Sequence, residues 1–188
     1  LLSALVALVL RGLASGNAAT WPFGGLAAST PGAWMALLVQ LLGTVIGVFS
    51  SRYLQGEANQ GRYLAAFAAV LASVHLLLLA GHWLVLIAAW ALVGTALNRL
   101  LCFYPERPFA QLAAHKKRLA DRLADALLLA AAACAWVEVG SGSLDALWRH
   151  VAQNGASPLL QASAVGLVLA VILRTALLPV HGWLIQVM

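Results

Sequence analysis

Apolar residues fall into runs of about 20 positions that are separated by shorter polar segments. A run of this length crosses the hydrocarbon core of a membrane as an α-helix. We expect four full spans, followed by a fifth that begins near Pro158 and reaches the Arg174–Pro179 region. The pattern predicts an all-α, polytopic bundle of transmembrane helices. The first four spans are residues 33–51, 63–80, 82–103 and 118–137.

The segments between the spans are predicted to be loops. Residues 11–32 are rich in Gly, Ala, Ser and Pro, and residues 104–117 combine prolines with charges. The polar segment 138–157 is expected to include a short surface helix around Leu144–Val151. The apolar piece Leu1–Leu10 resembles the tail of a truncated helix. We therefore expect residues 1–188 to be a fragment of one transmembrane domain, with about five full spans plus that truncated helix.

Composition supports the membrane assignment. The chain is 63% hydrophobic and 9% charged, whereas soluble domains carry about 25% charged residues. Its net charge of +5 does not indicate nucleic-acid binding, because the basic residues cluster between the apolar runs. Cys102 and Cys134 lie in apolar segments without metal-ligand spacing, and the five histidines are scattered. We expect no cofactor or metal in this chain, and no catalysis by this chain alone.

The basic residues also predict an orientation. Two segments, 52–62 and 104–117 with the start of the following span, fall on one side of the membrane and hold six basic residues, against two on the opposite side. Because basic loops stay inside, the 52–62 and 104–117 segments are expected to be cytoplasmic. The six are Arg52, Arg62, Arg107, Lys116, Lys117 and Arg118, and the two are Arg11 and Arg149.

One charge lies late in the last apolar run. Arg174 precedes Pro179 by five residues. A charge inside a membrane helix costs roughly 2.5–3.5 kcal/mol on insertion scales, and it marks a functional site by default. Proline removes a backbone donor and breaks or kinks a helix. A charge beside a helix break is typical of an ion pathway.

A second group of charges opens the fourth span. Asp125 is the last charge before an apolar run to Val137, and Asp121 shares its helical face. Two interpretations stay open for Asp125: a solvated helix start, or a buried carboxylate of a proton relay. Asp121 is expected to be solvated, while Arg122 has the spacing to pair with Asp125. Histidine is the side chain that most often changes its charge near neutral pH, which makes His181 a further relay candidate.

Two segments carry a resemblance to a known family. Residues 173–184 read Leu-Arg-Thr-Ala-Leu-Leu-Pro-Val-His-Gly-Trp-Leu, similar to the Leu-Lys-Ser-Ala-Gln-x-Pro-x-His-x-Trp-Leu pattern of antiporter-like membrane subunits of respiratory complex I and multisubunit cation/proton antiporters. Residues 116–125 resemble that family's Lys-x4-Asn-Arg-x-Gly-Asp segment. The resemblance implies an antiporter-like fold with a broken helix near Arg174–Pro179. It also implies an ion pathway through Lys116, Arg122, Asp125, Arg174 and His181.

A narrower resemblance rests on residues 98–108 and 113–117. They read Asn-Arg-Leu-Leu-Cys-Phe-Tyr-Pro-Glu-Arg-Pro and Ala-Ala-His-Lys-Lys, which is similar to DabB-type subunits of inorganic-carbon accumulation complexes. It implies a proton- or sodium-conducting subunit in a bacterial inner membrane. It also implies a cytoplasmic DabA-like partner that holds a zinc site similar to that of β-carbonic anhydrases, and an uptake of carbon dioxide or bicarbonate driven by ion flow.

Two positions depart from the family pattern. The respiratory subunits have Trp-Glu where this chain has Trp90-Ala91, and they have lysine where it has Arg174. A buried lysine can release its proton, but arginine cannot. Arg174 is therefore expected to act as an electrostatic partner of Asp125. Two alternatives remain: a subunit of a respiratory NADH dehydrogenase or cation/proton antiporter, and a membrane scaffold that anchors a cytoplasmic enzyme.

Overall fold

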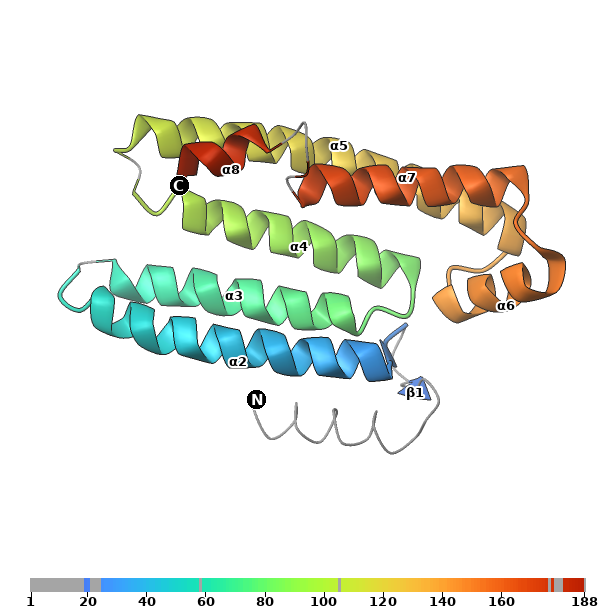
Figure 1. Cartoon of the computed structure of the whole chain (residues 1–188), viewed down its shortest axis with the longest axis horizontal. Helices are drawn as coiled ribbons and strands as arrows, with labels where there is room; N and C mark the ends of the chain where they lie inside the picture. Colours follow the sequence, from blue (N-terminus) through green and yellow to red (C-terminus); the bar gives the residue numbers. More distant parts are fainter. Residues whose placement is uncertain are drawn as a thin grey trace. The chain divides into compact units, whose positions relative to one another are not determined.

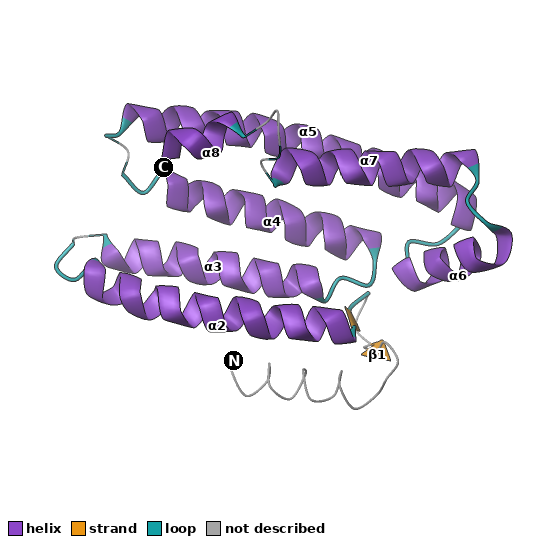
Figure 2. Ribbon diagram, viewed as in Figure 1, coloured by secondary structure: helices purple, strands orange, loops and turns teal. Residues whose placement is uncertain are grey.

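The computed structural model is almost entirely helical (Figure 1, Figure 2). It describes residues 19–20, 25–57, 59–104, 106–175, 177 and 181–187. The chain forms two compact units, Leu1–Leu97 and Asn98–Met188. The predicted N-terminal helix piece, Leu1–Leu10, and Pro179 lie outside the described residues.

Three long apolar helices follow the N-terminal segment. They are α2 (Thr30–Tyr53), α3 (Gln60–Leu78) and α4 (Trp83–Leu101), and α4 runs past the end of the first unit. Each is long and apolar enough to cross a membrane. The first three predicted spans are thereby confirmed as helices, with ends that differ by a few residues.

Small residues bring α2 and α3 together as antiparallel neighbours (Figure 1). A Cβ added to Gly43 would lie 2.6 Å from a methyl carbon of Leu71, so a larger residue would require the Leu71 side chain to move. Nearer the other end of α2, the hydroxyls of Ser50 and Tyr63 lie 3.4 Å apart. The rest of α2 exposes large apolar side chains, among them Trp34, Leu41, Val45, Phe49 and Tyr53. Such a surface suits lipid or other membrane helices rather than water.

The segment before α2 holds a short ladder instead of the expected loop alone. Strand β1 (Ala19–Thr20) pairs antiparallel with β2 (Ala27–Ala28), and Figure 2 colours these strands orange. The amide of Ala27 donates to the carbonyl of Leu79 at 2.8 Å, which ties this segment to the end of α3. The prediction of a loop over 11–32 missed this ladder because two-residue strands leave no periodic pattern.

The second unit contains α5 (Pro108–Val139), α6 (Leu144–Asn154), α7 (Pro158–Arg174) and α8 (Gly182–Val187). The short surface helix expected in the polar segment is confirmed as α6. Helix α7 begins at Pro158, as predicted, and the Ser157 side chain caps it by accepting from the Leu160 amide at 3.2 Å. Since α7 ends at Arg174 and α8 begins at Gly182, the helix break near Arg174 is also confirmed.

The predicted loop over residues 104–117 is wrong for most of its length. Helix α5 begins at Pro108, so residues 108–117 are helical. Proline is favoured in the first helical turn, and the Ala, Gln, Leu and Lys residues that follow are strong helix formers. Hydropathy marks where a helix can enter lipid, not where it begins. Lys116 and Lys117 therefore lie on a helix.

A buried face of small residues on α5 receives α7 and α8. A Cβ on Gly166 of α7 would lie 3.3 Å from the Cβ of Ala131. The Ser163 hydroxyl donates to the Ala131 carbonyl at 2.7 Å. Small residues permit this close approach of two backbones. The buried positions recur at helical spacing and are Ala113, Ala114, Lys117, Ala120, Ala124, Leu128, Ala131 and Ala135.

Candidate functional site

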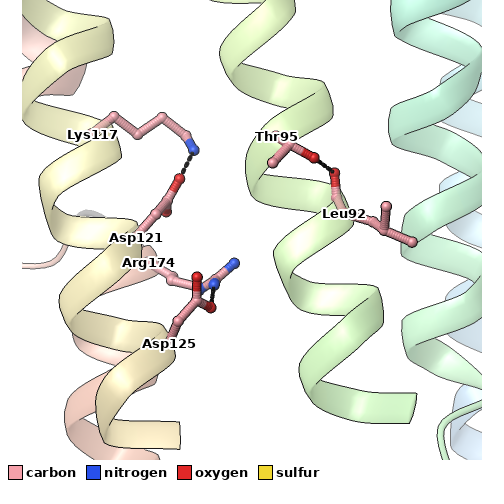
Figure 3. Close-up of polar contacts among 6 residues, drawn as sticks. All are labelled: Leu92, Thr95, Lys117, Asp121, Asp125 and Arg174. Atoms are coloured by element: carbon pink, nitrogen blue, oxygen red, sulfur yellow. Dashed lines mark hydrogen bonds and ion pairs between the residues drawn. The ribbon is translucent and has the colours of Figure 1, made fainter. Parts of the chain in front are cut away.

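An ion pair joins α5 to the end of α7. Arg174 is the last residue of α7, and its Nη2 donates to Oδ1 of Asp125. Figure 3 shows the two side chains pointing toward one another. The Arg174 side chain is only 6% exposed, and that of Asp125 is 32% exposed. The pairing expected from the sequence is therefore present, and it lies where the helix breaks.

A second ion pair lies on the same face of α5. Nζ of Lys117 donates to Oδ2 of Asp121, and Figure 3 draws this contact beside the first pair. The side chains are 5% and 15% exposed, respectively. The expectation that Asp121 is solvated is wrong. Because α5 begins at Pro108, Asp121 lies well inside the helix and on its packed face.

Helix α8 covers Lys117. Its Trp183 is 8% exposed, and the Trp183 ring centroid lies 6.0 Å from the Lys117 ammonium nitrogen. A cation over an indole ring is stabilised by the ring's quadrupole, most when water is excluded. His181 immediately precedes α8, and its Nδ1 is buried without a hydrogen-bond partner among the described residues. The segment after the helix break therefore returns to the charged face of α5.

The remaining sequence candidates do not join this cluster. Lys116 and Arg122 are exposed on α5. Arg122 has the spacing to pair with Asp125, but the recorded partner of Asp125 is Arg174.

The sequence interpretation missed Lys117 and misjudged Asp121. The signal was present: residues 117, 121 and 125 repeat every four positions, which puts them on one helical face with the buried alanines. Assigning Lys117 to a loop hid that repeat.

The four charges of this cluster balance. Two carboxylates, Asp121 and Asp125, lie one helical turn apart and are paired with one cation each. In a site of low dielectric constant, the protonation of each group depends on the charge of its neighbours. Arginine stays charged, but a buried lysine can give up its proton. The cluster therefore has the chemistry to hold and exchange protons.

Metal binding finds no support within the part of the chain that the structure describes. No group of three His, Cys, Asp or Glu side chains there is close enough to hold an ion. Cys102 and Cys134 are free thiols.

Comparison with protein families gives one match. Residues 80–188 match the model described as "NADH:quinone oxidoreductase/Mrp antiporter, TM". The matched region includes the whole second unit and both buried ion pairs.

Two curated relatives illustrate the range of similarity. The chain is 39% identical over 155 residues to "Probable inorganic carbon transporter subunit DabB2" of Halothiobacillus neapolitanus, which covers 82% of this chain and 28% of that protein. It is 27% identical over 150 residues to "NADH-quinone oxidoreductase subunit L" of Mycobacterium tuberculosis, covering 79% of this chain and 23% of that protein. The chain thus spans less than a third of the length of these relatives. The resemblance to antiporter-like subunits, and to DabB-type subunits in particular, is confirmed.

A solved structure shares the fold. A chain from the "Structure of the membrane-bound sulfane sulfur reductase (MBS), an archaeal respiratory membrane complex" aligns with a TM-score of 0.78 over 99% of this chain and 30% of that one. The two sequences are 18% identical, so the likeness concerns the fold alone. With three apolar helices of spanning length, it identifies a multi-pass membrane protein.

Proposed function

The chain belongs to the NADH:quinone oxidoreductase/Mrp antiporter transmembrane family, and from this premise we propose that it is an ion-conducting membrane subunit of an energy-coupled inorganic-carbon uptake complex. The ion is a proton or sodium, and the carbon substrate is carbon dioxide or bicarbonate. The higher identity to the DabB2 relative, 39% against 27% for the respiratory subunit, supports the carbon-uptake assignment.

The ion pair between Asp125 and the buried side chain of Arg174 carries the proposal of ion conduction. Charges inside a membrane protein are expensive and are kept mainly where ions or substrates move. This pair lies at the end of α7, on the face of α5 that packs through small residues such as Ala124 and Ala131 and also carries the Lys117–Asp121 pair. His181, beyond the break, has a buried ring nitrogen and is the next titratable group on that side. We place the centre of the pathway at Asp125 and Arg174, with His181 as a further member.

The proposed partner is a cytoplasmic, zinc-containing, DabA-like subunit. The name of the DabB2 relative describes a subunit of a transporter, which supports a multisubunit assembly. The proposed setting is a bacterial inner membrane. Lys117 is buried and cannot count as a loop charge, so the proposed cytoplasmic side holds five basic residues and the opposite side two. This excess still favours a cytoplasmic position for the 52–62 segment and the start of α5.

The test removes the carboxylate charge in the full-length protein within its complex. Asp125→Asn is expected to lower proton-driven uptake of radiolabelled inorganic carbon roughly 100-fold, the scale of losing a positioned proton-transfer group. Asp145→Asn is the matched control, because Asp145 pairs with Arg149 on α6 but its side chain is 62% exposed. Uptake that is unchanged in Asp125→Asn and still abolished by a protonophore would refute the assignment of the pathway. If uptake by the wild-type complex does not depend on the proton gradient, the result would instead favour the alternative of a membrane scaffold for a cytoplasmic enzyme.

A second candidate is a subunit of a respiratory oxidoreductase or cation/proton antiporter. The similarity to the Mycobacterium tuberculosis subunit favours it. Purification of the full-length protein with its native partners separates the two. A co-purifying soluble subunit with stoichiometric zinc supports carbon uptake, and co-purifying quinone-reducing or further antiporter subunits support the alternative.

A further inference from the structure

We propose that Lys117, and not Arg174, is the cation that gives up and regains a proton in this pathway, with Asp121 as its immediate acceptor. The inference rests on the proposed function, ion conduction along the buried face of α5. It assigns the exchangeable proton to a pair one helical turn from the Asp125–Arg174 pair.

Burial does not distinguish the two cations. The Lys117 side chain is 5% exposed and the Arg174 side chain is 6% exposed, and each donates to a carboxylate. Their chemistry does distinguish them. A guanidinium holds its proton throughout the accessible pH range, whereas an ε-ammonium that is removed from water releases its proton readily. A pathway that needs a cation to become neutral therefore needs Lys117.

The surroundings of Lys117 suit reversible exchange. Asp121 and Asp125 lie one and two turns along the same face of α5, Arg174 lies at the end of α7, and His181 precedes α8. Trp183 of α8 lies over the ammonium group and limits its access to water. The proton on Lys117 therefore meets a carboxylate before it meets solvent.

The exchange step is balanced in charge and in protons. The N–H bond at Nζ of Lys117 breaks, and the proton bonds to a carboxylate oxygen of Asp121, which leaves a neutral amine and a neutral acid. One positive and one negative charge disappear together, so the net charge of the buried cluster does not change. Asp121 then passes the proton toward Asp125, one turn away, and Lys117 takes up the next proton. Arg174 stays charged throughout and stabilises the Asp125 carboxylate.

Two charge-preserving substitutions in the full-length complex test this assignment. Lys117→Arg keeps a cation beside Asp121 but removes the releasable proton, and is expected to lower proton-driven carbon uptake roughly 100-fold. Arg149→Lys, at an exposed position of α6 outside the pathway, is the matched control and is expected to retain uptake. Complex assembled in the membrane is quantified for both variants, so that loss of transport is read per assembled complex. If assembled Lys117→Arg takes up carbon at the wild-type rate, the proposal is overturned. Arginine can replace a lysine whose role is only structural, but it cannot replace one that must release a proton.

A second variant covers the case in which Lys117→Arg does not assemble. Lys117→Met/Asp121→Asn replaces the buried pair by neutral side chains of similar size, a change that often preserves or raises stability. Assembled double variant without proton-driven uptake supports the proposal, and assembled double variant with normal uptake overturns it.

Removal of the proposed acceptor tests the exchange step directly. Asp121→Asn keeps the size of the side chain but cannot take the proton from Lys117, so proton-driven uptake per assembled complex is expected to fall roughly 100-fold. Unchanged uptake by assembled Asp121→Asn contradicts the assignment. If Asp125→Asn abolishes proton-driven uptake while Lys117→Arg leaves it intact, the proposed function stands and only this inference fails.

Discussion

The α2–α3 pair and the α5–α7 pair are built alike but differ in what they bury. Both pairs are antiparallel, and both allow close approach at a glycine, Gly43 in the first and Gly166 in the second. The sequences of α2 and α3 contain one charged residue each, Arg52 and Arg62, close to the helix ends. Helix α5, in contrast, brings Asp125 into an ion pair with Arg174 of α7.

Polar side chains link the helices of both pairs, Ser50 to Tyr63 in the first and Ser163 to Ala131 in the second, and others bond within a single helix. In α2 and α3 several of them bond back to their own helix: the Thr44 hydroxyl donates to the Gln40 carbonyl at 2.7 Å, and the Ser73 hydroxyl donates to the Ala69 carbonyl at 2.6 Å. In the second unit the Ser163 hydroxyl of α7 crosses to the Ala131 carbonyl of α5. A bond within one helix satisfies a hydroxyl without linking two helices.

The comparison teaches that close helix packing here does not require charge. Among the described residues, α2 and α3 pack closely at Gly43 without an ion pair between them, so the charges of α5 and α7 are not needed for close packing and carry a desolvation cost. The charges between α5 and α7 are therefore better explained by a role in ion conduction than by a role in packing.

The largest effect on stability is expected from breaking one buried ion pair. Lys117→Met leaves the Asp121 carboxylate buried and unpaired, and is expected to destabilise the protein by roughly 3–5 kcal/mol. Arg62→Met in α3 removes a cation from an exposed position and is expected to change little. Thermal unfolding of the purified full-length complex in detergent measures both. Equal unfolding temperatures would show that the two helix pairs do not differ in the role of their charges.

An intermediate effect is expected where the pairs are alike. Gly166→Leu forces a side chain against Ala131, and overpacking of this kind costs about 1–3 kcal/mol. Gly43→Leu is expected to cost a similar amount, while Gly61→Leu, at a position with open space around it, costs little. Unfolding temperatures rank the three variants. Carbon uptake sharpens the contrast, because only Gly166→Leu displaces the helix that carries Arg174; equal loss of uptake in Gly43→Leu would contradict it.

The smallest effect is expected from the hydroxyl groups. Ser163→Ala leaves the Ala131 carbonyl without its bond from α7 and is expected to cost about 1 kcal/mol. Ser73→Ala removes a bond within α3 and is expected to be nearly neutral. Chemical or thermal unfolding of the two variants side by side is the measurement. A larger loss for Ser73→Ala would reverse the distinction between bonds within and between helices.

Most of the fold follows from hydropathy, because a run of about 20 apolar residues has few alternatives to a membrane helix. Pro158 also marked the beginning of α7 correctly, and α7 ends within the Arg174–Pro179 region where the break was expected. The start of α5 was missed because its first turns are polar, and hydropathy does not distinguish a polar helix from a loop.

One of the two ion pairs of the candidate site could be predicted from the sequence. The pairing of Asp125 with Arg174 was expected from the family resemblance, because an arginine at the position of the family's lysine cannot release its proton but can still act electrostatically on a carboxylate. The Lys117–Asp121 pair was missed because its burial depends on where α8 returns to α5. The contact between α8 and α5 is a tertiary contact, and the local pattern of residues in either helix does not predict it.

Helix α5 has 32 residues and is therefore about 48 Å long, against roughly 30 Å for the hydrocarbon core of a bilayer. One end of it must project into the headgroups or the water unless the helix tilts steeply. An unbroken α-helix behaves as a stiff rod, so a force applied to the projecting end near Pro108 is transmitted along its length to Lys117, Asp121 and Asp125. In the proposed complex, a soluble subunit that binds this end acts on these charged side chains without entering the membrane.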